Sequence, residues 1–228
     1  MKPKVIGLGA GGHAKVLIEA LGKMDTYEVV GLLDAKSSLH GRTVLGLPVL
    51  GADEMMPQLV QQGVTRFFLG LGSVGDSTMR QRVFQRAIEY GLEPVSVIHP
   101  GAWLSASARV GRGICALACA VVNADACLGE NTIVNTGSII EHDCVIGAHV
   151  HIAPRACLAG GVSVGEGSHI GIGALVRQNI RIGRNAIVGA GAVVIKDVPD
   201  EFVVAGVPAR IIRPAHSRIL NPAPMEKG

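Results

Sequence analysis

The chain has 228 residues, enough for one large domain or two small ones, and only 3% of them are aromatic, whereas glycine occurs 31 times. This composition excludes a core built on large aromatic side chains and favours a narrow interior of Val, Ile and Ala. The net charge of +3 is too small to indicate a nucleic-acid-binding protein, and no stretch is long and apolar enough for membrane insertion. Five cysteines without a C-x-x-C pair favour a reducing, cytoplasmic location over a disulfide framework.

The first part of the chain, residues 1–98, has the pattern of a small α/β domain. Strands are predicted at residues 4–8, 29–33, 64–69 and 95–98, and helices at 13–21, 53–62 and 77–90; the rest of 41–63 has no regular pattern. Four parallel strands with intervening helices form a Rossmann-like sheet, and such sheets bind ligands at the carboxyl ends of their strands.

The predicted ligand crevice of this domain begins at a literal G-x-G-x-x-G, residues 7–12, directly after the first strand. Asp34 ends the second strand, and an acid about twenty residues beyond such glycines is expected to contact a ribose. The third strand runs into the turn at residues 70–73. The crevice residues are Gly9, Gly11, Gly12, His13, Asp34, Gly72 and Ser73. A domain this short holds one mononucleotide half, which disfavours a dinucleotide oxidoreductase; a purely structural glycine turn is the alternative.

The second part of the chain repeats every six residues. Between residues 110 and 194, every sixth position is Val, Ile or Leu except Ala116, and the frame starting at Gly113 holds Gly, Asn or Asp at twelve of fifteen positions. One aliphatic and one tight-turn residue per six is the signature of a parallel β-helix. Eighteen residues close a triangular coil, so these units predict five coils, with small side chains such as Ala120 and Cys144 filling the interior beside the aliphatic columns.

The segment His99-Pro100-Gly101 separates the two predicted domains. The β-helix domain is expected to span residues 99–214, with a cap at 202–212 after Pro199, and residues 215–228 are expected to form a loose tail. The repeat itself does not determine the handedness of the coil. Parallel crossovers are nearly always right-handed, so this general rule would predict the wrong hand if the coil is left-handed.

Three segments carry a resemblance to a known family: GAGGHAKV near the start, NTGSIIEHDCVIGAHVHIAP in the middle and VVAGVPAR near the end. They resemble the left-handed β-helix acyltransferases, in the branch of the sialic-acid O-acetyltransferases and the nucleotide-amino-sugar N-acetyltransferases of the bacillosamine and perosamine pathways. The resemblance covers roughly residues 4–214. It implies a left-handed coil, acetyl-CoA as co-substrate, a nucleotide-linked sugar in the N-terminal crevice, and a homotrimer with active sites between subunits.

The candidate catalytic segment is Glu141-His142-Asp143. On an eighteen-residue coil, His142 has Ala124 and Gly160 as neighbours, so space is left beside the imidazole. An attacking amine or hydroxyl must lose a proton, and histidine titrates near working pH. The resemblance implies that His142 is the base and that Asp143 orients it. Glu141 is the alternative orienting residue, and a solvated surface histidine is the structural alternative.

The predicted acetyl-CoA site extends from this segment. Glycines at 160 and 161 would let a thin acyl-pantetheine chain lie close to the backbone, and Arg177 is well placed for phosphates. The resemblance places His151 near the acetyl donor. The full predicted set is His151, Gly160, Gly161, Gly173 and Arg177.

Other features leave questions open. A metal site at His149, His151 and His169 is disfavoured, because no carboxylate or thiolate column completes a ligand set. His149 and Arg155 occupy corner positions without an evident reason. Apolar outer residues would favour a trimer, since cyclic association buries such surface; they are Val121, Ile133, Ile139, Val145 and Ile187.

The sequence thus predicts an acetyl-CoA-dependent N-acetyltransferase of a nucleotide-linked amino sugar, acting by direct attack of the amine on the thioester. The alternatives are an O-acetyltransferase of a sialic-acid-type sugar and a non-catalytic sugar-binding protein that retained the prism.

Overall fold

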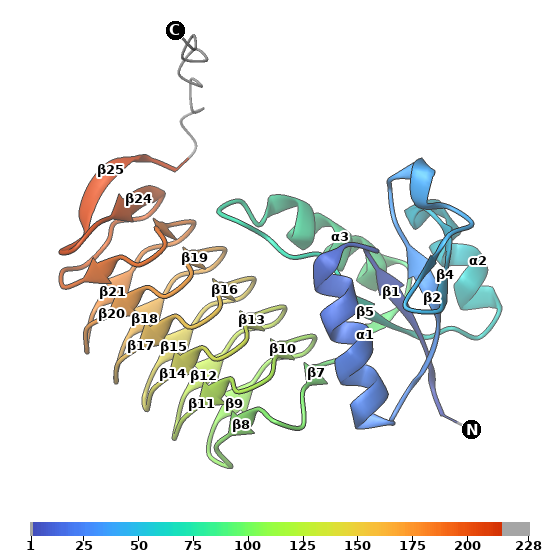
Figure 1. Ribbon diagram of the computed structural model, residues 1–228, viewed down its shortest axis with the longest axis horizontal. Coiled ribbons are helices and arrows are strands. Elements are labelled where there is room, and N and C mark those ends of the chain that lie inside the picture. Colours follow the sequence, from blue (N-terminus) through green and yellow to red (C-terminus); the bar gives the residue numbers. More distant parts are fainter. Residues whose placement is uncertain (1, 216–228) are drawn as a thin grey trace, which may run out of the picture.

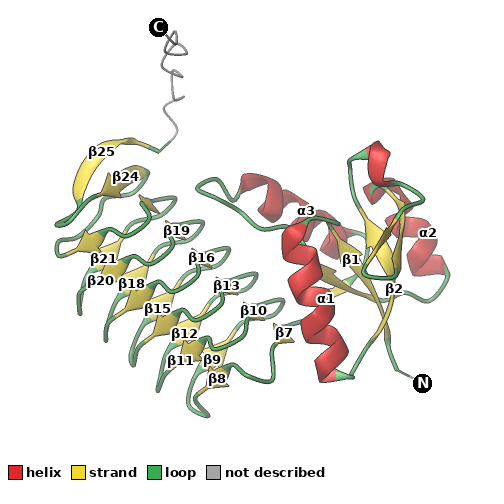
Figure 2. Cartoon of the chain, in the orientation of Figure 1, coloured by secondary structure: helices red, strands yellow, loops and turns green. Residues whose placement is uncertain are grey.

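The computed structural model describes residues 2–215 and consists of an α/β domain beside a tall triangular β-helix (Figure 1). Helices gather in the α/β domain, and the remainder is built of short strands joined by turns (Figure 2). The tail expected at 215–228 lies outside the described residues from 216 on. Among the described residues, no helix has the length and apolar character needed to cross a bilayer.

The α/β domain is a six-stranded sheet with the order β3-β4-β2-β1-β5-β6. All its pairings are parallel except that of β3 with β4. Its strands are β1 (Lys4–Leu8), β2 (Glu28–Leu33), β3 (Thr43–Val44), β4 (Leu47–Gly51), β5 (Arg66–Leu69) and β6 (Glu93–Pro94). Its helices are α1 (Gly12–Met24), α2 (Met56–Gln61) and α3 (Thr78–Glu89), with 3-10 turns at Ser37–Leu39 and Asp53–Met55.

Two expectations for this domain were wrong. The stretch expected to be irregular contains the β3–β4 hairpin, whose turn places Leu45 at φ 48° and Gly46 at φ 80°; a leucine at positive φ gives no turn signal in a sequence. The strand expected at 95–98 is not the fourth strand of the sheet. β6 ends the sheet, and Val97–Ile98 form β7, which pairs with Cys115–Ala116 eighteen residues later.

The β-helix contains one two-residue strand in every six residues, as predicted. Each strand pairs in parallel with the strand eighteen residues away, for example Cys115 with Ile133. The strands are β7 (Val97–Ile98), β8 (Trp103–Leu104), β9 (Arg109–Val110), β10 (Cys115–Ala116), β11 (Val121–Val122), β12 (Cys127–Leu128), β13 (Ile133–Val134), β14 (Ile139–Ile140), β15 (Val145–Ile146), β16 (His151–Ile152), β17 (Cys157–Leu158), β18 (Ser163–Val164), β19 (His169–Ile170), β20 (Leu175–Val176), β21 (Arg181–Ile182), β22 (Ile187–Val188) and β23 (Val193–Val194). A hairpin of β24 (Phe202–Ala205) and β25 (Arg210–Pro214) covers the end of the stack.

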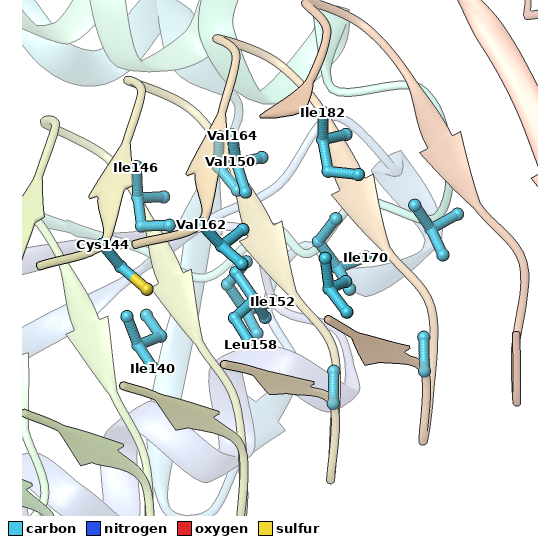
Figure 3. Close-up of a cluster of buried hydrophobic side chains, with 14 of the residues drawn as sticks. Ile140, Cys144, Ile146, Val150, Ile152, Leu158, Val162, Val164, Ile170 and Ile182 are labelled. Carbon is cyan, nitrogen blue, oxygen red and sulfur yellow. The ribbon is translucent and has the colours of Figure 1, made fainter. Parts of the chain in front are cut away.

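The strands stack into three flat faces. We call them the first face (β7, β10, β13, β16, β19, β22), the second face (β8, β11, β14, β17, β20, β23) and the third face (β9, β12, β15, β18, β21). The second residue of each strand points inward, and side chains such as Ile140, Ile152 and Leu158 are fully buried in stacked columns (Figure 3). Small residues such as Cys144 fill the narrow interior beside them.

The corners between the faces have the predicted backbone. Every sixth residue from Gly113 to Gly191 has a φ between 49° and 71°. Cys119, His149 and Arg155 share this left-handed conformation, which costs a non-glycine residue roughly 1–2 kcal/mol. Arg155 therefore has the same corner backbone as the glycines of this frame.

The α/β domain packs against the first face. Leu17 of α1 and Phe68 of β5 belong to one buried cluster with Cys115 and Ile133 of the β-helix. The loop before α3 continues over the coils, where a Cβ at Gly75 would lie 3.3 Å from Ile187 Cδ1 (Figure 1). Ile133, expected on an outer surface for trimer contacts, is thus covered within the chain and is only 1% exposed.

Candidate functional site

The candidate catalytic segment, Glu141-His142-Asp143, lies at the edge where the second face meets the third. His142 Nδ1 lies 2.7 Å from Asp143 Oδ2, and both side chains are exposed. The hydrogen bond that the imidazole makes to the Asp143 carboxylate raises the pKa of His142. With Nδ1–H donating to the carboxylate, Nε2 is the nitrogen that can accept a proton.

Glu141, the alternative orienting residue, has a different partner. Its Oε2 accepts a hydrogen bond of 2.9 Å from Asn123 Nδ2, one coil earlier. The carboxylate that contacts the imidazole is therefore that of Asp143.

The imidazole lies over Gly160 of the next coil. A Cβ at position 160 would approach His142 Cε1 to 2.5 Å and Nε2 to 2.6 Å, so only glycine fits beneath the ring in this position. Beside the ring is a hollow of ≈ 450 Å³; its lining consists of His142, Asp143, Ala159, Gly160, Gly161, Gln178 and Asn179. The predicted room for a thin chain at Gly160 and Gly161 is present.

The other predicted acetyl-CoA residues lie on three different parts of the prism. Arg177 is exposed on the same edge, one coil above Ala159. Gly173 is a corner between the first and second faces, with φ 65°. His151 projects from the first face and is 7% exposed, so the chain itself does not bring it to His142.

His151 is held by hydrogen bonds beneath the α/β domain. Its Nδ1 lies 2.6 Å from Ser73 O and its Nε2 lies 3.0 Å from Asn135 Nδ2. The ring packs edge-on against His169, at 5.0 Å between centroids. Burial lowers the pKa of His151 to about 3, partly offset by the bond to Ser73, with His169, Arg80 and His13 lowering it further. His151 is therefore neutral and joins the two domains.

In the N-terminal crevice, Asp34 is bonded to the glycine turn. Its Oδ2 accepts from Ala10 N at 2.8 Å and its Oδ1 from Lys36 N at 2.9 Å. Gly9 has φ 101°, a conformation that favours glycine, while Gly11 and Gly12 are exposed with open space beside them. Asp34 thus shapes the turn that would face a ligand.

His13, Gly72 and Ser73 come together, as predicted. A Cβ at Gly72 would lie 3.7 Å from His13 Cβ. Within residues 2–215, His13 Nε2 and Ser73 Oγ are both enclosed without a hydrogen-bond partner, as are His169 Nδ1 and Arg80 Nε. Burial, aided by the charge of Arg80, lowers the pKa of His13 to about 4. Unpartnered polar atoms of this kind are costly, and two of them belong to residues predicted to line the acceptor crevice.

His169 lies one coil above His151, as the eighteen-residue spacing predicts, and the sequence suggested it only as a metal ligand. Arg80 is the polar residue of this region that sequence reasoning missed. Arg80 is only 2% exposed and belongs to the buried stripe of α3 with Val83, Phe84 and Ala87. An arginine at an apolar position of a helical stripe was the available signal. The described residues contain no group of side chains suited to a metal ion.

Comparison with known proteins identifies the family of this chain. Family models for the PglD N-terminal domain and the bacterial transferase hexapeptide repeat match residues 4–87 and 161–196. The chain is 42% identical to PerB from Caulobacter crescentus, solved with CoA and GDP-perosamine; the match covers 92% of this chain and 97% of that one, with a TM-score of 0.86. The chain belongs to this family of hexapeptide-repeat acetyltransferases.

Two further members of the family have the same fold. The acetyltransferase domain of PglB from Neisseria gonorrhoeae FA1090, solved with acetyl coenzyme A, is 36% identical, with 93% of this chain and 100% of that chain covered and a TM-score of 0.83. WeeI from Acinetobacter baumannii AYE is 26% identical, with 92% and 100% covered and a TM-score of 0.74. A comparison with curated proteins found no match. The left-handed β-helix, the acetyltransferase class and acetyl-CoA as co-substrate, all predicted from the sequence, are confirmed.

Proposed function

We propose that this acetyltransferase transfers the acetyl group of acetyl-CoA to the amine of a nucleotide-linked amino sugar, with His142 as general base. The observation that carries the proposal is the pair His142–Asp143, whose free Nε2 faces a hollow over Gly160. The chemistry of the acceptor is supported by PerB, which was solved with GDP-perosamine. Five cysteines without a C-x-x-C pair support a reducing, cytoplasmic location for this reaction.

In the proposed reaction, the sugar amine attacks the carbonyl carbon of the thioester while His142 Nε2 takes its proton. The C–S bond then breaks, and the imidazolium returns the proton to the leaving sulfur of CoA. Asp143 holds Nδ1–H and stabilises the imidazolium. The oxyanion needs a donor. Gly161 N donates to His142 O, whereas Gly160 N has no acceptor in the part of the chain that the structure describes, so Gly160 N–H is the candidate donor.

We further propose that the site is completed by a second copy of the chain in a homotrimer. His142 lies on the edge between the second and third faces, whereas His151 and the crevice lie on the first face. The outer column of the second face is apolar along the whole stack, with Trp103 64% and Leu175 49% exposed. It consists of Trp103, Val121, Ile139, Cys157, Leu175 and Val193, adjacent in register. Association through this column would bury it and bring the first face of one copy towards His142 of another.

Mixed assemblies test both proposals. At acceptor concentrations well below KM, His142→Ala should be nearly inactive on a nucleotide-linked amino sugar, and Asp34→Ala should keep about a tenth of the wild-type rate. If the two variants are unfolded together and reassembled, some sites would combine an intact edge from one chain with an intact crevice from the other, and the rate should exceed that of either variant alone. Light scattering should give a trimer mass. A mixed rate no higher than the average of the two well-folded variants would refute the shared site, and wild-type activity confined to free sialic-acid-type sugars would refute the acceptor.

A further inference from the structure

In the part of the chain that the structure describes, three corners along one edge of the β-helix each leave one backbone carbonyl without a backbone donor. At the edge between the third and first faces, Asn131, His149 and Gly167 lie eighteen residues apart. The N–H of each corner residue donates to the preceding coil, as in Asn131 N to Arg112 O and His149 N to Glu130 O. In the described part of the chain, no backbone N–H of the next coil donates to the carbonyl oxygens of these three corners. They form a column of outward-facing acceptors.

Side chains from one segment of the α/β domain fill this column. Arg80 Nη1 donates to Asn131 O at 2.5 Å and to Asn131 Oδ1 at 2.6 Å, and its Nη2 donates to His149 O at 2.8 Å. Ser77 Oγ donates to Gly167 O at 3.1 Å and accepts from Gln81 Nε2 at 2.8 Å. A single guanidinium thus bridges two successive coils, and Ser77 reaches the third.

Arg80 is an unusual residue for a domain contact, because its hydrogen-bond acceptors are neutral. It is 2% exposed, and the oxygens it contacts are three backbone carbonyls and one amide. A buried charge without a carboxylate is costly, so apolar packing would serve stability better. Burial lowers the pKa of Arg80 to about 10, which leaves it charged at neutral pH. Apolar packing cannot fix the position of α3 along the stack of coils. The planar guanidinium can, because its donors have set angles and match the corner carbonyls at one height only.

The segment that Arg80 fixes carries the proposed acceptor residues. Gly72 and Ser73 lie in the loop that precedes α3, and this loop is tied to the first face by the bond between Ser73 O and His151 Nδ1. We propose that Arg80 is a positioning residue, which sets the height of this loop on the β-helix and thereby aligns the acceptor crevice with the first face. The kinetic part of this inference rests on the proposed function.

The kinetic test compares Arg80→Met with Arg82→Met, since Arg82 is exposed on the same helix. For folded, assembled protein, Arg80→Met should raise the KM for the nucleotide-linked amino sugar at least ten-fold and leave the KM for acetyl-CoA within two-fold. Arg80→Lys should resemble Arg80→Met, because one ammonium cannot reach both corners. Arg82→Met should behave as wild type. A lower melting temperature with unchanged kinetic constants would overturn the inference, because it would show a purely structural role.

A second readout is independent of activity. Amide hydrogen exchange in residues 70–77 should be at least ten-fold faster in Arg80→Met than in Arg82→Met, while the coils at 157–164 keep their protection. Unchanged exchange at 70–77 would overturn the inference even if the wild-type protein proved inactive. If Arg80→Met does not fold, Asn131→Gly replaces it. Glycine keeps the carbonyl and the left-handed corner and removes the Oδ1 acceptor together with the 2.9 Å contact of Nδ2 with His149 Nδ1, and the same changes should appear in weaker form.

Discussion

Mild acid should weaken the contact between the two domains. Burial lowers the pKa of His13 to about 4 and that of His151 to about 3, from 6.5 in each case. A histidine whose pKa is lowered by folding binds its proton more weakly when folded. Its contribution to stability is therefore complete above pH 6.5 and is lost as the pH falls below this value towards the folded pKa.

The loss of unfolding free energy is set by the difference between the unfolded pKa of 6.5 and the pH. At pH 5.0 this difference is 1.5 units, and the pH is still above both folded pKa values. Each group therefore costs about 2 kcal/mol of unfolding free energy at pH 5.0 relative to pH 7.5. The two together correspond to a decrease of roughly 8–16 °C in melting temperature for a chain of this size. His149 and His169 act in the same direction, since burial lowers the pKa of both.

The assay is the melting temperature at pH 7.5 and pH 5.0 for the wild type, for a His13→Asn/His151→Asn double variant and for an exposed control, His40→Asn. Asparagine at 151 can keep the hydrogen bond to Ser73 O but cannot take up a proton. The wild type and the control should lose stability in acid, and the double variant should lose much less. Equal losses in all three proteins would refute the reasoning, because the acid sensitivity would then come from other groups.

The catalytic site yields three further predictions. His142→Ala should lower kcat about 10²–10⁴-fold with an unchanged KM for acetyl-CoA, as stopped assays with both substrates would show, and retention of most activity would exclude His142 as the base. Gly160→Ala should lower kcat at least ten-fold without lowering the melting temperature, because its Cβ would displace an exposed imidazole rather than disturb the core; full activity would contradict the close contact. Asp34→Ala should raise the acceptor KM about ten-fold, since the loss of its bonds to Ala10 N and Lys36 N costs about 1–3 kcal/mol, and an unchanged KM would leave the glycine turn a structural role alone.

The β-helix could be predicted closely because its determinants are local. One aliphatic residue and one tight-turn residue recur in every six residues. The strands and corners of each coil could therefore be predicted without knowing what packs against the coil. The same arithmetic placed Gly160 beside His142, where the structure has it. Residues 97 and 98 already follow the frame, and the expected sheet strand there was wrong because the local apolar pattern fits either assignment.

The contact between the domains could not be predicted in this way. Arg80 falls on the apolar stripe of its helix and Ile133 on an outer position of the prism, but neither pattern says what covers the residue. Only the docking of α3 and α1 on the first face buries them. For the same reason, His151 was assigned to the acetyl donor without any indication that its Nδ1 is bonded to Ser73. Periodicity gives the face from which a side chain projects, and tertiary packing decides what covers that face.

Asp143 illustrates how a corner residue can carry two signals at once. Its φ of 60° is the left-handed conformation that every corner of the stack requires, and aspartate tolerates that conformation better than most residues. Its Oδ2 also holds His142 Nδ1, so the residue type fits both the backbone and the chemistry. Replacement by alanine would disturb both. Asparagine tolerates the same backbone and removes only the charge, so a loss of kcat in Asp143→Asn with an unchanged melting temperature would assign the effect to the carboxylate rather than to the corner.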